Sequence, residues 1–225
     1  MHPSHEKKHR PDEILQGVIK IICYISLPLI VLFWGTIVSS LLISGSINTN
    51  VNTATSFVQV AVSFSLPMLI TLTIIPLTIQ FFLQHNTFEN LGFSRTPQKW
   101  SLIVCAFLGV FIVAVTYTLS GNKEIEISSG TICFHFLIVA ISEEVILRSV
   151  IMYEMRTLVS NPFILCIMNA VIFAFVYHSS EDFLSNLLIR FPLGLVLSYS
   201  RLKSNDIYLP IMLHWAYNMG LTAIG

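Results

Sequence analysis

The sequence predicts an all-α protein whose helices cross a membrane about seven times. Of its 225 residues, 54% are hydrophobic and only 11% are charged, whereas about 25% of residues are charged in ordinary soluble domains. No Asp, Glu, Lys or Arg occurs from Ile21 to Phe88, and this interval is too long for one span of about 20 residues. The formal net charge is zero, so charge gives no reason to expect nucleic acid as a partner.

Apolar segments separated by polar turns define the expected helices. The apolar stretch 21–43 is long enough to be a retained first span rather than a cleaved signal. Pro67 and Pro76 predict kinks in the second span, and Trp100 is placed to anchor the third at the membrane interface. We expect about seven membrane helices, or eight, with the seven over residues 21–43, 56–83, 100–119, 131–158, 162–178, 183–200 and 207–224.

The chain divides into three regions by composition. A polar segment, 1–20, precedes the N-terminal membrane helices, 21–130, and the catalytic membrane core is expected over 131–225. The lipid bilayer is the expected surrounding, and the sequence does not indicate an oligomeric state. The cysteines have neither disulfide-framework nor zinc-site spacing, so we expect buried, reduced thiols. They are Cys23, Cys105, Cys133 and Cys166.

Basic residues alternate between the connections along the chain. They gather in the N-terminal segment and in the connections that hold Arg95, Arg156 and Arg201, whereas the alternate connections hold only Lys123. Cytoplasmic loops carry an excess of Lys and Arg. We therefore expect a multi-pass protein of the cell membrane with its N-terminus in the cytoplasm and its C-terminus outside.

A charged cluster interrupts the apolar run of the fourth predicted helix. It contains Glu143, Glu144 and Arg148, and an ionised side chain at the centre of a spanning helix costs about 2.5–3.5 kcal/mol. Glu144 and Arg148 stand at i,i+4, which favours an ion pair, while Glu143 lies about 100° around the helix. We predict that the arginine holds Glu144 and that Glu143 is free for chemistry. The alternative is a helix end whose charges lean toward lipid headgroups.

Three further polar residues lie in the later apolar segments: His178, His214 and Asn218. Alone, each is explained by hydrogen bonding between membrane helices, but together with the glutamates they suggest a hydrolytic site. A carboxylate can take a proton from water beside a histidine, and a histidine and an amide can stabilise an oxyanion. Alternatively, Glu143, His178 and His214 could ligate zinc. The spacing does not decide, although the His-Glu-x-x-His signature is absent.

The order of these motifs resembles a known family. Glu143-Glu144-x-x-x-Arg148, a Phe-containing stretch that ends in His178, and His214-x-x-x-Asn218 are similar to the CAAX-protease and bacteriocin-processing (CPBP, or Abi) family of intramembrane endopeptidases. This family includes type II CAAX prenyl endopeptidases and bacteriocin self-immunity proteins. The resemblance covers residues 136–221, and the 91–93 segment, Leu-Gly-Phe, also resembles one that is frequent in the family.

The resemblance implies a role for each residue of the motifs. Glu143 would be the general base, assisted by His178. Glu144 and Arg148 would shape and neutralise the site. His214 and Asn218 would stabilise the oxyanion, and a rival account of the family makes the histidines and a glutamate metal ligands.

The second motif departs from the family pattern at one position. The family usually has phenylalanine four residues before the histidine, where this chain has Ala174 between Phe173 and Phe175. The departure leaves the packing role of the phenylalanine open. Gly194 and Ser198 fit the small residues expected on the sixth helix, where helices approach closely.

The leading hypothesis is an intramembrane endopeptidase that cuts membrane-associated peptides or proteins by glutamate- and histidine-activated water. Peptide maturation, bacteriocin self-immunity and prenyl-protein processing are its candidate roles, with zinc as the one candidate cofactor. A proton-coupled transporter could use the same acids and histidines as a relay, although no inverted repeat of the kind found in many transporters is present. A non-catalytic membrane partner is the third hypothesis.

Overall fold

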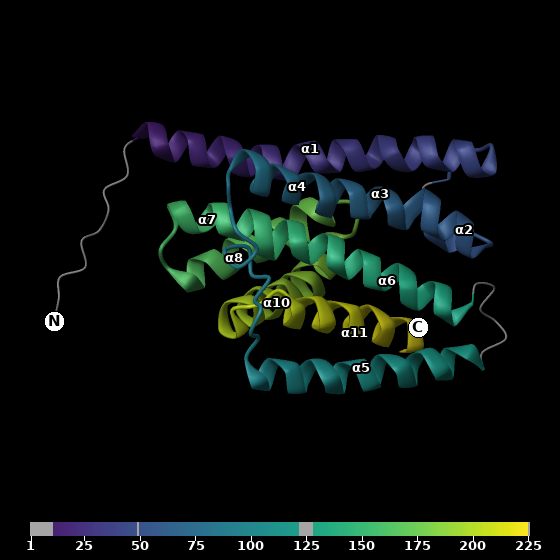
Figure 1. The fold of residues 1–225 in the computed structure, drawn as a ribbon. Coiled ribbons are helices and arrows are strands. Elements are labelled where there is room, and N and C mark those ends of the chain that lie inside the picture. The colour runs from purple at the N-terminus through teal and green to yellow at the C-terminus, as the bar shows by residue number, and fades with distance from the viewer. Residues whose placement is uncertain (1–10, 49, 122–127, 225) are drawn as a thin grey trace.

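The computed structural model describes residues 11–48, 50–121 and 128–224, and every regular element in this part of the chain is helical. The helices lie side by side in a layered bundle, with α1 (Pro11–Ser44) along one edge and α5 (Lys99–Ser120) along the opposite edge (Figure 1). The polar segment 1–20 is described only from Pro11, where α1 begins, and the loop that holds Lys123 lies outside the described residues.

Several helices are long and apolar enough to cross a membrane. The described chain holds five, which are Pro11–Ser44, Phe57–Leu83, Lys99–Ser120, Ser129–Leu158 and Phe183–Ser204. The helix Pro162–Tyr177 is apolar but shorter, and α11 (Tyr208–Ile224) ends the chain. All seven predicted segments are therefore helical. The prediction of an all-α, multi-pass membrane protein is confirmed, while the number of spans stays a prediction.

The second long helix, Phe57–Leu83, changes its hydrogen-bond pattern along its length. Proline has no N–H and cannot continue a regular ladder, and π-helical segments accompany both Pro67 and Pro76. The helix thus changes type near both prolines, while the kinks expected there stay a prediction. In order, the segments are α2 (Phe57–Val60), η2 (Ala61–Ser65), α3 (Leu66–Met68), η3 (Leu69–Ile74), α4 (Ile75–Thr78) and η4 (Ile79–Leu83).

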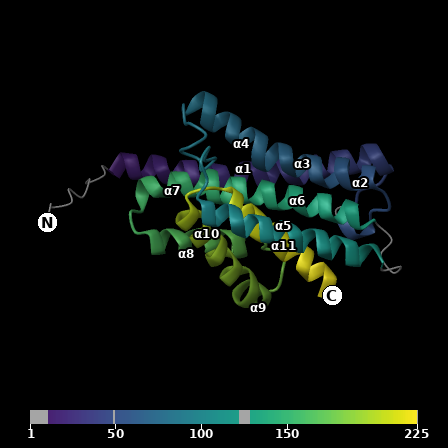
Figure 2. The same ribbon diagram turned by 60° about the horizontal axis from the view of Figure 1, so that its bottom comes forward.

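A central helix runs between α1 and the C-terminal helices (Figure 2). It consists of α6 (Ser129–Glu144), the π-helical η5 (Val145–Ile151) and α7 (Met152–Leu158). Every residue of η5 is buried. Ile146 and Val150 pack in one apolar cluster with Tyr24 of α1 and Leu72 of the second helix. This packing holds the charged cluster of the central helix inside the protein.

The next helical segments are α8 (Pro162–Ile172), η6 (Phe173–Tyr177), α9 (Phe183–Ser185), η7 (Asn186–Arg190) and α10 (Phe191–Ser204). Of these, α8 and α10 pack against η5 and against each other. A Cβ atom on Gly194 would lie 3.0 Å from the Cα of Ala170, so α10 and α8 touch through their backbones there. The close approach predicted for Gly194 and Ser198 is confirmed at Gly194.

The start of α11 is buried inside the protein. Asp206 and Ile207 are fully buried, and the Ile207 N–H donates to the Gly92 carbonyl oxygen over 2.8 Å. Gly92 has φ +93, and a Cβ there would lie 2.2 Å from the Arg201 guanidinium, so this position requires glycine. The connector 84–98 therefore covers the start of α11, which places His214 deeper in the bundle than a helix beginning at the surface would.

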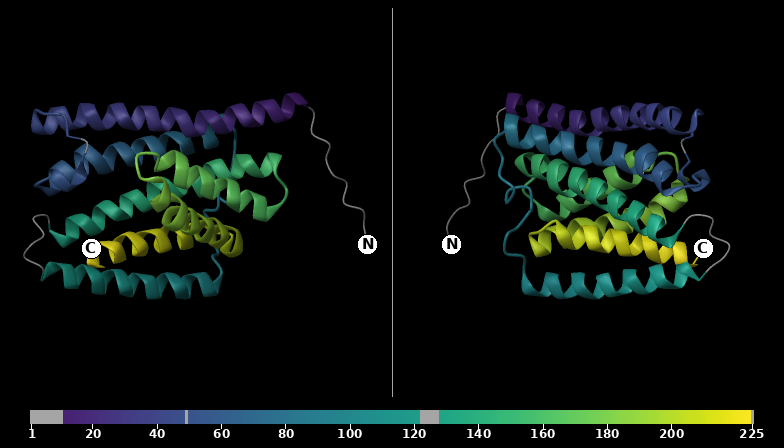
Figure 3. Two further views of the ribbon diagram at one scale, coloured as in Figure 1. Left: turned by 180° about the vertical axis from the view of Figure 1, so that it is seen from behind. Right: turned by 45° about the vertical axis from the view of Figure 1, so that its right-hand side comes forward.

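The basic connections lie at one end of the bundle. The N-terminal end of α1, the connector 84–98, the turn after α7 and the turn after α10 all gather there (Figure 3). The connector with Arg95, the last turn of α7 with Arg156 and the last turn of α10 with Arg201 are thus on the same side, in agreement with the alternation of basic residues in the sequence. That this side faces the cytoplasm stays a prediction.

The cysteines depart from expectation in their burial. All four are free, but only Cys166 is buried, while Cys105 and Cys133 are half-buried and Cys23 is exposed. The prediction of buried thiols is wrong for Cys23 because α1 lies at the edge of the bundle and presents most of its surface outward.

Candidate active site

The predicted site residues come from three helices that meet near the middle of the bundle. Glu143 and Glu144 end α6, and Arg148 follows in η5. His178 follows η6, and His214 lies in α11. A π-helical segment inside an α-helix is frequent at functional sites, and here two of them, η5 and η6, carry or adjoin the site. The structure therefore brings together side chains that are far apart in the sequence.

Glu144 is the fixed centre of the cluster. Its Oε1 accepts from Arg148 Nη1 over 3.0 Å and lies 2.8 Å from His214 Nδ1. Glu144, Arg148 and His214 are all buried, with exposed fractions of 0%, 1% and 3%. Because an ionised carboxylate only accepts hydrogen bonds, the shared proton is assigned to His214 Nδ1. The prediction that the arginine holds Glu144 agrees with this geometry, and the contact with His214 is an addition to it.

Glu143 faces both imidazole rings without touching either. Its Oε2 lies 3.6 Å from His178 Nε2 and 3.9 Å from His214 Nε2. These distances exceed a direct hydrogen bond, and Oε2 is buried with no hydrogen-bond partner among the described residues. A buried carboxylate oxygen without a partner is costly. A water molecule bound between Glu143 and the histidines would satisfy it.

Other buried polar atoms near the cluster also lack partners. Within the described residues, Ser142 Oγ, Glu144 Oε2 and Tyr177 OH have no hydrogen-bond partner. Such atoms are uncommon in folded proteins and point to bound water or to a ligand. Glu144 belongs to the cluster, and Ser142 and Tyr177 are the chain neighbours of Glu143 and His178. The unpaired oxygens of Glu143 and Glu144 favour a hydrated site.

Phe173 packs against three residues of the cluster. Its ring makes edge-to-face contacts with His178, at 4.9 Å between ring centroids, and with His214, at 5.8 Å. The Arg148 guanidinium carbon lies 4.7 Å from the centre of the same ring, a cation–π distance. The π-helical turn η6 begins at Phe173 and ends just before His178. Phe173, five residues before the histidine, thus packs on the site although position 174 is alanine.

Asn169 connects the helices behind the site. Its Nδ2 donates to the Leu147 carbonyl oxygen over 2.8 Å, and its Oδ1 accepts from Ser198 Oγ over 3.1 Å. The π-helical pattern around Leu147 frees backbone groups that need such partners. Arg148 Nη2 also reaches the Gly194 carbonyl oxygen over 3.4 Å. Sequence reasoning missed Asn169, whose only signal was an amide inside an apolar segment.

Asn218 stands apart from the other five predicted residues. It is half-buried and lies one turn after His214 on α11, as its i,i+4 spacing predicts. Among the described residues no hydrogen bond joins its side-chain amide to Glu143, Glu144 or His178; its backbone oxygen accepts from Thr222 Oγ1 over 3.0 Å. Its place beside His214 is compatible with a contact to substrate, and its role stays a prediction.

A second buried histidine lies on the same central helix. His135 Nδ1 is 2.9 Å from Ser65 Oγ, and His135 is 8% exposed. Farther along, Gln80 Nε2 donates to Glu154 Oε1 over 2.9 Å. These contacts join the second helix to the central helix away from the cluster. They show the structural use of buried polar groups that sequence reasoning had weighed for the site residues.

The zinc alternative requires a group of metal ligands. In residues 11–48, 50–121 and 128–224, no three His, Cys, Asp or Glu side chains form a group that could hold a metal ion. Glu143, His178 and His214 are neighbours, but they do not form such a group.

The fold and the cluster define a multi-pass membrane protein with acids and imidazoles gathered inside its C-terminal helices. Residues 126–220 match the family model described as type II CAAX prenyl endopeptidase Rce1-like. This segment contains all six predicted site residues. Over this segment the match agrees with the resemblance shown by the three motifs, and at the level of the family it supports an intramembrane endopeptidase.

The other two comparisons give no relatives. No curated protein and no solved structure matches the chain.

Proposed function

We propose that this protein hydrolyses peptide bonds inside the membrane with a water molecule activated by Glu143. The observation that carries the proposal is the position of Glu143 Oε2, which is buried and unpaired, 3.6 Å from His178 Nε2 and 3.9 Å from His214 Nε2. A water molecule that lies beside these three atoms would have three polar neighbours. A carboxylate placed in this way serves as a general base.

The first step forms the bond between water oxygen and the peptide carbonyl carbon. Glu143 Oε2 takes a proton from the water as its oxygen attacks the carbonyl carbon, and the carbonyl oxygen becomes an oxyanion. His178 orients the water, and its side chain, 26% exposed, is also the member of the cluster most open to proton exchange. In the second step the C–N bond breaks and the leaving nitrogen takes the proton from Glu143.

His214 and Asn218 are the proposed donors to the oxyanion. Glu144 fixes the His214 ring through Nδ1, so Nε2 faces Glu143 and the reacting group. Two carboxylates and one guanidinium leave one negative charge in the cluster, and one further proton on a histidine balances it. A His214 protonated on both nitrogens donates from Nε2, and such a donor is worth about 2.7–4 kcal/mol in the transition state.

Arg148 and Phe173 are proposed to hold this arrangement rather than to react. Arg148 pairs with Glu144, and its guanidinium rests over the Phe173 ring. Phe173 in turn packs edge-to-face on both histidines. A catalytic group must be held by its neighbours to within a fraction of an ångström.

The proposed substrates are membrane-associated peptides or proteins. Peptide maturation, self-immunity against bacteriocin-type peptides and cleavage of prenylated tails are the candidate roles, and the proposed setting is the cell membrane with the N-terminus in the cytoplasm. The transporter and the non-catalytic partner remain the competing functions.

The test compares two buried glutamates of the central helix. Purified wild type, Glu143→Gln and Glu154→Gln are incubated with prenylated and unprenylated membrane peptides, and the products are identified by mass spectrometry. We expect Glu143→Gln to lose about 10²–10⁴-fold in rate. Glu154 is 3% exposed and bonded to Gln80, outside the cluster, so Glu154→Gln controls for the loss of a buried acid.

Three outcomes separate the hypotheses. Cleavage by wild type and Glu154→Gln but not by Glu143→Gln supports the proposal. Equal cleavage by all three proteins would contradict the role of Glu143. Proton-coupled uptake in vesicles that depends on Glu143, without cleavage of any peptide, would favour the transporter.

A further inference from the structure

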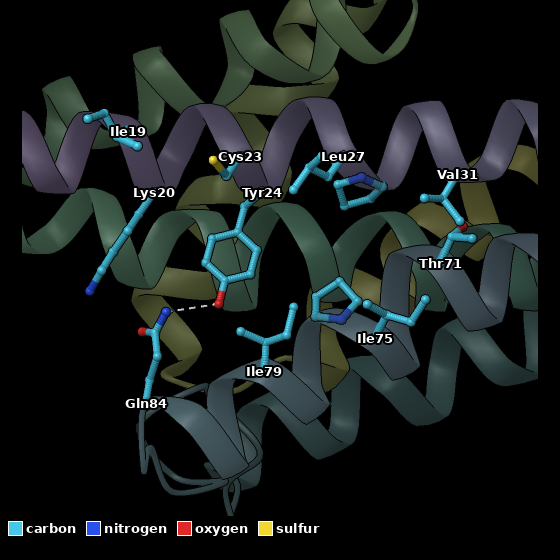
Figure 4. Close-up of a pocket in the computed structure, with 12 residues that line it drawn as sticks. Ile19, Lys20, Cys23, Tyr24, Leu27, Val31, Thr71, Ile75, Ile79 and Gln84 are labelled. Carbon is cyan, nitrogen blue, oxygen red and sulfur yellow. Dashed lines mark hydrogen bonds between the residues drawn. The ribbon is translucent and has the colours of Figure 1, made fainter.

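A groove runs along the membrane face between α1 and the second helix (Figure 4). Its volume is about 450 Å³, and none of its lining residues belongs to the catalytic cluster. The walls are mostly apolar, with Leu27 and Val31 on the α1 side and Ile75 and Ile79 on the other. Leu27 and Val31 are exposed, so the groove is continuous with the surface that faces lipid.

Three polar groups of the groove, on Lys20, Tyr24 and Gln84, lie at one end, whereas Val31 and Thr71 close the other end (Figure 4). The Thr71 hydroxyl donates to the Pro67 carbonyl oxygen over 2.8 Å within its own helix. Lys20 immediately precedes the apolar stretch 21–43, and Gln84 immediately follows the second helix. Both helices therefore reach the membrane interface where the polar end of the groove begins.

The length of the groove equals about one leaflet. Val31 follows Lys20 by eleven positions in α1, or about 17 Å at the helical rise per residue. The hydrocarbon core of a bilayer is about 30 Å thick, so one leaflet is about 15 Å. The distance from Lys20 to Val31 therefore matches the depth that one lipid acyl chain spans within a single leaflet.

Two groups at the polar end are free to bind an anion or an ester. Within the described residues Lys20 has no ion pair, because no carboxylate lies within salt-bridge distance of its ammonium group. The Tyr24 oxygen accepts from Gln80 Nε2 and Gln84 Nε2 over 3.1 and 3.0 Å. Its own O–H has no acceptor among the described residues. A cation and a free donor at the interface complement a phosphate headgroup.

We propose that the groove binds one anionic phospholipid, with its phosphate at Lys20 and Tyr24 and one acyl chain along the groove toward Val31. The site is independent of the proposed hydrolysis. The bound chain fills the space between α1 and the second helix, which are joined at the polar end by the Tyr24–Gln84 contact.

The test uses photo-reactive lipids on the purified full-length protein in vesicles. Phosphatidylglycerol with a diazirine in one acyl chain is compared with phosphatidylcholine that carries the same chain, and labelled residues are mapped by mass spectrometry. We expect phosphatidylglycerol to label Leu27, Ile75 and Ile79 more than Phe107 and Val110, which are exposed on the apolar face of α5. Equal labelling of both faces would reduce the groove to ordinary lipid contact and overturn the proposal.

Two pairs of variants test the two ends of the groove. Lys20→Gln should lower groove labelling by phosphatidylglycerol about fivefold and leave phosphatidylcholine unchanged. Val31→Trp should block the apolar end, while Val38→Trp, two turns farther along the exposed surface of α1, should not. If Val31→Trp and Val38→Trp were labelled equally in the groove, or if both lipids labelled it equally, the proposed site would be wrong.

Discussion

His214 Nδ1 lies 2.8 Å from Glu144 Oε1, and this contact sets the orientation of the ring at the centre of the cluster. Since Glu144 also accepts from Arg148, one carboxylate oxygen holds both a cation and an imidazole. The remaining ring nitrogen, Nε2, is thereby directed toward Glu143. The two adjacent glutamates thus have different surroundings: Glu144 is held at Oε1 by Arg148 and His214, whereas Glu143 Oε2 faces two imidazole rings at distances longer than a direct hydrogen bond.

Loss of Arg148 should destabilise the protein as well as inactivate it. Arg148→Ala leaves Glu144 buried without its cation, and breaking a buried ion pair in this way costs about 3–5 kcal/mol. We expect a lower folded yield and a lower unfolding temperature in detergent. Arg156→Ala is the matched control, since Arg156 is an exposed arginine of the same central helix. An Arg148→Ala protein as abundant and heat-stable as Arg156→Ala would contradict the ion-pair role.

The histidines should separate catalysis from stability. His178→Ala removes a partly exposed side chain 3.6 Å from Glu143, so we expect lost cleavage with little change in unfolding temperature. His214→Ala should lower both the rate of cleavage and the unfolding temperature, because it also removes the hydrogen bond to buried Glu144. His135→Ala should lower stability but leave cleavage per folded molecule unchanged, because His135 is bonded to Ser65 outside the cluster. Rate and thermal unfolding measured on the same samples check all three. Normal cleavage by His178→Ala would remove that histidine from the mechanism.

Gly194 should not tolerate a methyl group. A Cβ there would lie 3.0 Å from the Ala170 Cα and 3.0 Å from the Phe173 ring, and overpacking of this kind costs about 1–3 kcal/mol. Because Phe173 packs on both histidines, we expect Gly194→Ala to lower the rate of cleavage as well as the unfolding temperature. At Gly109 on α5 the nearest atom would be 3.9 Å away, so Gly109→Ala should be neutral or slightly stabilising. Equal unfolding temperatures for the two variants would show that α8 and α10 can separate without cost.

Removal of metal should leave the proposed reaction intact. The mechanism uses Glu143 as the base, and no metal-holding group of His, Cys, Asp or Glu occurs in the described part of the chain. We expect protein that has been dialysed against a chelator and shown to be metal-free by elemental analysis to cleave at the original rate. Activity that disappears with the metal and returns with added zinc would establish the zinc alternative.

The sequence was sufficient to predict the cluster because buried charge in a membrane is expensive. Glu143, Glu144 and Arg148 had to be paired or hydrated inside the protein, and the structure places Arg148 on Glu144 and His178 near Glu143. The helices were predicted from apolar segments of about 20 residues separated by polar turns, and such segments in a membrane satisfy their backbone hydrogen bonds as helices.

The supporting contacts could not be predicted from spacing. Phe173 reaches the histidines through the π-helical turn η6, and a π turn shifts the position that faces the site by one residue relative to an α-helix. The partner of Asn169 is a backbone carbonyl freed by the π pattern of η5. Neither change of helix type has a signal in the hydrophobic pattern.

The depth of His214 depended on tertiary packing. Counted from Ile207, His214 lies only about 10 Å along the helix, so a helix that began at the membrane surface would leave His214 too shallow to meet Glu143. The start of α11 is buried because Gly92 of the connector bonds to Ile207. The fold of this connector over α11 rests on a contact between residues that are more than a hundred positions apart, which local sequence patterns do not show.

The most direct test of the central claim is a double-mutant cycle on kcat/KM for peptide cleavage by Glu143→Gln, His178→Ala and the double variant. If both side chains act on one water molecule, the double variant should lose no more than the worse single variant, as residues that act as a unit are strongly non-additive. If the two losses multiply instead, Glu143 and His178 act independently, and the account of a shared water would be contradicted.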